Sequence, residues 1–137
     1  MTEDIGFQVR LEMPYEAALE AVTAALKVEG FGVLTRIDVQ ATLKEKVGAD
    51  FRQYAILGAC NPPLAQRALS TDGWVGLMLP CNVTVEEGSK GGSLVRIANP
   101  VMMMQAGRMH GNEALSEVAA EARARLERVA IALDAVS

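Results

Sequence analysis

Hydrophobic and polar residues alternate along much of this chain, and a two-residue period predicts β-strands. The predicted strands cover residues 5–11, 31–37, about 51–57 and 93–98. In the first strand, the side expected to face a core carries Ile5, Phe7, Val9 and Leu11. Such alternation is typical of strands that have one buried face and one solvent-exposed face. The pattern therefore favours a mainly antiparallel sheet.

Apolar residues at helical spacing predict helices between and after these strands. One helix opens at Pro14 and stops at Gly30. A short helix with Asp38 as its N-cap precedes Gly48, and another starts at Pro62 with Asn61 as its N-cap. The last helix carries the longest apolar stripe, which consists of Leu115, Val118, Ala119, Ala122, Leu126, Val129, Leu133 and Val136.

The apolar run over residues 74–86 is interrupted by Pro80, which cannot donate a hydrogen bond to a strand ladder. We expect a bulge or a sheet edge at this proline. The glycine-rich turn over residues 88–92 then returns the chain into a hairpin. The inward side of this hairpin is expected to contain Val83, Val85, Val95 and Ile97. Together the patterns predict one α+β domain over residues 1–137, with about five strands and helices packed on one face.

Composition narrows the class of protein and its partners. The 137 residues are half hydrophobic, which is enough for one continuous core, and the formal net charge is -4. Because no segment gathers lysines and arginines, we expect neither nucleic acid nor an anionic membrane as a partner. The acidic start lacks the pattern of a secretory signal, and charges interrupt every apolar run, so a cytoplasmic location is predicted.

Several segments resemble the bacterial and archaeal family known as domain of unknown function 302 (DUF302). They are residues 29–35, 37–44, 51–52, 57–62 and 79–83. The resemblance implies a small α+β domain with a mainly antiparallel sheet, helices on one face and a tendency to form homodimers. It implies no activity. Gln53 stands where the family commonly has proline, and Gln66 where histidine is frequent, which puts any role of that histidine in doubt here.

Two cysteines are the strongest candidates for chemistry, because each precedes an asparagine and lies near a proline. The two motifs are Cys60-Asn61-Pro62 and Pro80-Cys81-Asn82. Cys60 precedes a predicted helix N-terminus, where free N–H groups favour a thiolate. If the flanking strands are neighbours, both sulfurs would lie near one end of the sheet. The alternative is that the two cysteines have no chemical role and are buried as small hydrophobic side chains of the core.

A second cluster of soft ligands follows the last strand. It consists of Met102, Met103, Met104, Met109 and His110. Thioether, thiolate and imidazole groups together would suit Cu(I), but consecutive methionines cannot share one helix face and often fill cores or interfaces. Asn112 as a helix N-cap explains the sequence around His110 without a catalytic role. Two cysteines and one histidine are also too few for a closed zinc site.

Three functions remain open. The first is a homodimeric binding module that holds a small ligand or a soft metal such as copper at Cys60, Asn61, Cys81 and Asn82, with the cysteines as metal ligands. The second is a thiol-dependent enzyme or sulfur-relay protein that uses Cys60 as a nucleophile, for which the sequence offers no clear general base. The third is a structural or regulatory dimer whose cysteines belong to the core. Exposed-looking Trp74 and Met102 to Met104 weakly support a dimer.

Overall fold

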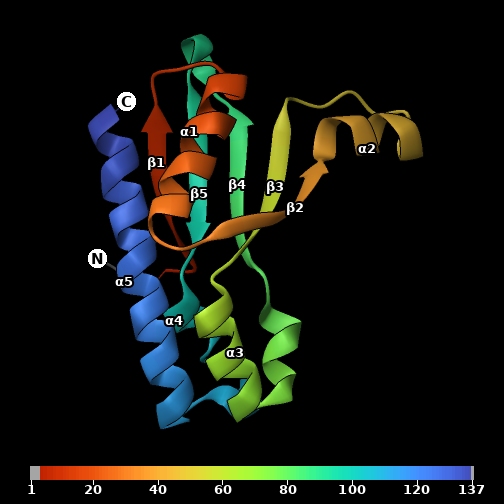
Figure 1. Cartoon of the computed structure of the whole chain (residues 1–137). Helices are drawn as coiled ribbons and strands as arrows, with labels where there is room; N and C mark the ends of the chain where they lie inside the picture. Colours follow the sequence, from red (N-terminus) through yellow and green to blue (C-terminus); the bar gives the residue numbers. More distant parts are fainter. Residues whose placement is uncertain (1–3, 137) are drawn as a thin grey trace.

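A single five-stranded antiparallel sheet organises the chain (Figure 1). In this computed structural model, which describes residues 4–136, the strand order is β1-β5-β4-β3-β2. The strands are β1 (Gly6–Leu11), β2 (Gly32–Asp38), β3 (Tyr54–Cys60), β4 (Cys81–Glu87) and β5 (Ser93–Ala98). Every neighbouring pair of strands is antiparallel. The predicted α+β class is therefore confirmed.

The helices occupy three places around this sheet. Two long helices, α1 (Tyr15–Val28) and α5 (Glu113–Val136), lie together over one face, as Figure 1 shows. The second group lies beyond one end of the sheet and consists of α3 (Pro62–Thr71), α4 (Pro100–Met103) and the short 3-10 helices η1 (Gly73–Met78) and η3 (Gly107–Met109). A further turn, η2 (Ser89–Gly91), closes the β4–β5 hairpin. The third place belongs to α2 (Val39–Val47), which stands off beside the sheet edge.

Local sequence signals set most helix ends. The side chain of Asp38 accepts a hydrogen bond from the backbone N–H of Ala41, and Asn61 and Asn112 cap α3 and α5 in the same way. Gly30 has φ of +85°, the left-handed conformation that ends a helix. The predicted caps and the glycine stop are thus confirmed.

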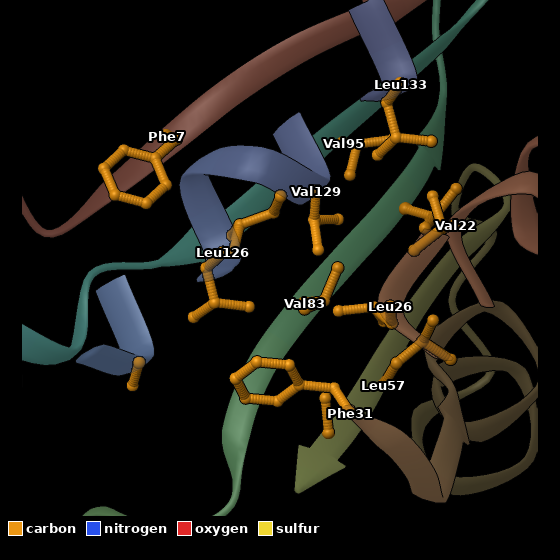
Figure 2. Packing of buried hydrophobic residues seen from close by; sticks show 14 of the residues in the cluster. Phe7, Val22, Leu26, Phe31, Leu57, Val83, Val95, Leu126, Val129 and Leu133 are labelled. Atoms are coloured by element: carbon orange, nitrogen blue, oxygen red, sulfur yellow. The ribbon is translucent and has the colours of Figure 1, made fainter. Parts of the chain in front are cut away.

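The core lies between the sheet and the pair formed by α1 and α5. Leu126, Val129 and Leu133 of α5 meet Val83 and Val95 of the sheet (Figure 2). All four inward residues predicted for the hairpin are buried. The α5 stripe is buried throughout except at its last member, Val136, which is 62% exposed.

Four sequence predictions are corrected by the structure. Ile5 precedes β1 and is 70% exposed, so it does not join the core. The third strand is shifted along the chain and ends at Cys60 rather than before Gly58. Met102 to Met104 are partly buried rather than exposed. The last correction concerns Pro80, which interrupts no strand and marks no edge.

Pro80 follows a cis peptide bond from Leu79 and directly precedes β4, a central strand. The apolar residues before it form η1 instead of a strand. The missing N–H of proline is harmless there, because the strand ladder has not yet begun. As a result, Cys81 is the first residue of a central strand.

The segment Gly32–Val47, which contains β2 and α2, forms an arm at the edge of the sheet. No residue of α2 is buried, and in β2 only Val33 is even partly buried. Leu34 and Val47 remain 67% and 70% exposed. Helices this short are marginal without packing partners. The rest of the chain therefore leaves the β2–α2 arm largely uncovered, with Leu34, Ile37 and Val47 exposed on it.

Candidate thiol site

The two cysteines lie at the same end of two neighbouring central strands. Ala59 of β3 is paired with Cys81 of β4, and Cys60 is the next and last residue of β3. Both cysteines are free thiols and both are partly buried. The neighbouring strands that the sequence analysis required for a thiol pair are therefore present.

A small cavity of about 40 Å³ lies next to both cysteines. Its walls come from the end of β3, the start of β4 and the helices α3, α4 and α5. Apart from Asn61 and the sulfur-containing residues, the lining consists of Phe31, Ala59, Leu64, Ala65, Ala68, Leu79, Pro100, Leu115, Val118, Ala119 and Ala122. An apolar cavity of this kind excludes water and favours apolar or soft occupants.

Asn61 ties this corner to the two long helices. Its Oδ1 atom accepts a hydrogen bond of 3.2 Å from the backbone N–H of Leu64, while its Nδ2 atom lies 3.5 Å from the backbone oxygen of Glu29. The same Glu29 oxygen accepts a hydrogen bond from Arg125 of α5. The corner is thus fixed by bonds that reach α1 and α5.

Replacement of Asn61 by Ala is expected to lower the free energy of unfolding by about 0.5–2 kcal/mol, because α3 loses its cap. Urea denaturation of the wild type and the variant measures this loss. Asn82 is the matched control, since it is exposed and the structure assigns it no cap. An Asn61→Ala protein as stable as Asn82→Ala would contradict the capping role.

Gly58 is required by the close approach of β2 and Pro80. A Cβ atom at this position would lie 2.7 Å from Pro80 Cγ and would also collide with Thr35 Oγ1. Gly58→Ala is therefore expected to destabilise the fold by about 1–3 kcal/mol through overpacking. A Cβ atom added at Gly32, on the neighbouring strand β2, would have no atom within 4 Å. Gly32→Ala therefore serves as the control. Equal urea midpoints for the two variants would refute the steric argument.

Burial controls the protonation of Cys81. Removal from water, with a smaller contribution from charge on the neighbouring Cys60, raises the pKa of its thiol to about 11. Cys81 is therefore a neutral thiol at physiological pH.

A larger groove of about 520 Å³ lies on the face of the sheet opposite α1 and α5. Asn82 and Cys81 line it, together with Gln8, Thr84 and Arg96. The hydroxyl of Thr84 is buried and has no hydrogen-bond partner among residues 4–136. The predicted site residues therefore line two different spaces. Asn82 lines the outer groove, whereas Cys60 and Asn61 line only the inner cavity.

Met104 is the site residue that sequence reasoning did not single out. It is the C-cap residue of α4 and lines both the inner cavity and the outer groove. Met103 lines only the groove, and Met102 lines neither. Met109 is buried in the core. The three consecutive methionines thus have different surroundings, as expected from their positions on one short helix.

His110 lies away from the thiols. Its Nδ1 atom is 2.8 Å from Gln105 Oε1, and its side chain is exposed and lines neither cavity. Gln66 is likewise exposed on α3 and does not line the cavities beside Cys60. Among residues 4–136, no three histidine, cysteine or acidic side chains form a cluster that could bind a metal. His110 therefore neither activates Cys60 nor completes a metal site with the cysteines.

No helix within the described part of the chain is long and apolar enough to cross a membrane.

Comparison with known proteins places these features in a family. The model of the family described as "Domain of unknown function DUF302" matches residues 7–133. A search of curated proteins gave no match. Among solved structures, the chain is similar to an uncharacterized conserved DUF302 protein from Bacillus stearothermophilus. The two share 32% identity and a TM-score of 0.82 over 93% of this chain and 97% of the other. The match spans both cysteines and almost every element of the fold, and the chain therefore belongs to the DUF302 family.

Proposed function

We propose that this protein is a binding module that takes a soft metal ion or a small apolar ligand at the corner formed by Cys60, Asn61 and Cys81, with Asn82 on the groove side. The observation that carries the proposal is the apolar cavity beside both thiols. A cavity of this kind suits soft or apolar occupants and disfavours strongly hydrated ones. We predict that the protein works in the cytoplasm, where thiols stay reduced.

The lining of the cavity supports binding over catalysis. Burial raises the pKa of Cys81 to about 11, so Cys81 itself is not a nucleophilic thiolate in the neutral range. A thiol enzyme based on Cys60 would also need a base, and no histidine lines the cavity in the described chain. The enzymatic and sulfur-relay alternatives consequently lack the group that would remove a proton from the nucleophile.

We also propose that two copies associate through the β2–α2 arm. β2 is an edge strand with unpaired backbone groups, and Leu34, Ile37 and Val47 around it are exposed. An edge strand can pair with its own copy about a two-fold axis, and the arm of each copy would then cover the other. Such an interface would give the short α2 helix the packing that its own chain does not provide.

Replacing Cys60 tests the binding function. The probes are Cu(I), added under reducing and oxygen-free conditions, and xenon, which detects an accessible apolar cavity. The wild type is expected to retain one Cu(I) after dialysis or to bind xenon in the cavity. Cys60→Ser is expected to lose the metal while its stability changes by no more than about 1–2 kcal/mol.

Cys60→Ala is the matched variant, since it removes the sulfur without adding a hydroxyl that would be poorly satisfied when buried. Loss of the metal in both variants would support a binding role. A Cys60→Ser protein that is destabilised but retains Cu(I) would instead support cysteines that serve only as core residues. A wild type that takes up neither probe would refute the binding function.

Substitutions that introduce charge into the β2–α2 arm test the proposed dimer. Light scattering at micromolar concentration is expected to give the mass of two chains for the wild type. The double variant Leu34→Asp/Val47→Asp should give the mass of one chain, because buried unpaired carboxylates would face each other in the interface. Val28→Asp is the control, since Val28 is 82% exposed on α1, outside the arm. A monomeric wild type would contradict the proposal.

A further inference from the structure

Three sulfur atoms, rather than two, belong to residues around the inner cavity. Cys60 comes from the end of β3, Cys81 from the start of β4, and Met104 from the end of α4. The three residues lie far apart in the sequence. Only the packing of α4 beyond the end of the sheet places the methionine beside the two thiols.

Two separate observations support the proximity of these residues. Cys60, Cys81 and Met104 all line the same cavity of about 40 Å³, and Cys60 directly follows Ala59, the residue paired with Cys81. Cys81, Met104 and Pro100 also line both the inner cavity and the outer groove, so they form the wall between the two spaces. Cys81 is therefore the common neighbour of Cys60 and Met104.

The donor set selects a particular class of ion. Thiolates and thioethers are soft ligands that favour Cu(I), whereas Zn²⁺ sites usually have four nitrogen, sulfur or carboxylate ligands. Among residues 4–136, no histidine or acidic side chain joins the cysteines in a cluster that could bind a metal.

We infer that Cys60, Cys81 and Met104 together form a three-sulfur site for Cu(I). This inference rests on the proposed binding function and names its ligand and its third donor. Each thiol that binds as a thiolate releases its proton to water, and copper stays in the Cu(I) state throughout. The ion is expected to arrive from the outer groove, where Met78, Met103 and Met104 provide further thioethers close to Cys81.

The decisive experiment compares the Cu(I) affinities of two methionine variants. Competition with a chromogenic Cu(I) chelator, without oxygen, measures the affinity of each protein. Met104→Leu conserves volume and removes only the sulfur donor. We expect it to weaken Cu(I) binding by about tenfold or more, since even the loss of an outer-shell partner commonly costs that much at metal sites. Met102→Leu is the control, because Met102 lines neither cavity, and its affinity should match the wild type.

Copper K-edge absorption of the loaded wild-type protein provides an independent measurement. Three sulfur neighbours around copper are expected, and loss of one of them in Met104→Leu would identify the methionine as a ligand. Equal Cu(I) affinities for the wild type and Met104→Leu, with two sulfurs around copper in both, would overturn the inference while leaving the binding function intact. A wild type that binds xenon but no Cu(I) would also overturn it, whereas failure with both probes would refute the proposed function itself.

Discussion

Alkylation of Cys81 at pH 7 is expected to be about 100-fold slower than that of an ordinary thiol, because only the thiolate reacts and a pKa shift of two units changes its population by that factor. The reason is local. Burial raises the pKa of Cys81 from 9.0 to about 11, and a charge on Cys60 acts in the same direction. Iodoacetamide labelling followed by peptide mass spectrometry measures each cysteine separately.

The pH profile separates protonation from simple shielding. If protonation limits the reaction, the labelling rate of Cys81 should increase about tenfold for each unit by which the pH is raised, as long as the pH stays below the pKa of about 11. The same protein in denaturant is the control, since both cysteines then react as ordinary thiols. Rapid labelling of native Cys81 at pH 7 would contradict the neutral thiol and revive an enzymatic function.

Replacement of Glu86 by Gln is expected to lower the free energy of unfolding by about 2–3 kcal/mol at pH 7, because hydrogen bonds to a charged partner contribute more than neutral ones. The Glu86 carboxylate is buried in the sheet and accepts hydrogen bonds from Arg52, at 2.7 Å, and from Arg96. Both arginines are half exposed, which keeps the expected loss below that of a fully buried ion pair.

Acid should remove the same stabilisation. Burial alone would raise the pKa of the Glu86 carboxyl, but its hydrogen bonds with Arg52 and Arg96 outweigh burial and lower the pKa below the ordinary value. A lowered pKa in the folded state stabilises the fold above the unfolded value of roughly 4.3, and this contribution is lost as the pH falls below it. The free energy of unfolding should therefore decline more steeply below pH ~4 in the wild type than in Glu86→Gln.

Urea denaturation at several pH values tests both expectations. Glu20→Gln is the control, because Glu20 is exposed on α1 and lies outside the sheet. The control should lose little stability at pH 7. A Glu86→Gln protein with the stability of this control, or with an unchanged acid profile, would refute the role of the buried carboxylate.

Local signals in the sequence determined most helix ends and the periodic segments of the fold. Asp38, Asn61 and Asn112 cap helices as predicted, because a cap needs only a side chain and the N–H groups two or three residues later. The hairpin and the long stripe of α5 were also predictable, since periodic burial is a property of a single segment. The strand and helix patterns and the family resemblance both indicated the α+β class, which the antiparallel sheet confirms.

The position of Pro80 shows where local reasoning fails. A proline in an apolar run indicates a break, but the sequence does not say whether the break lies inside a strand or before it. The chain forms η1 ahead of the proline and starts a central strand directly after it. The difference depends on the pairing of β4 with β3 and β5, which is a contact between distant segments.

The candidate site depends on tertiary structure in the same way. The sequence indicated Cys60 and Cys81, and it indicated a thiol pair only on the condition that their strands are neighbours. The strand order meets that condition. Sequence reasoning could not choose Met104 from three consecutive methionines, because what distinguishes them is which one α4 turns toward the cavity. The sequence thus determined the local elements and the types of ligand, while long-range packing alone decided which sulfur atoms share one cavity.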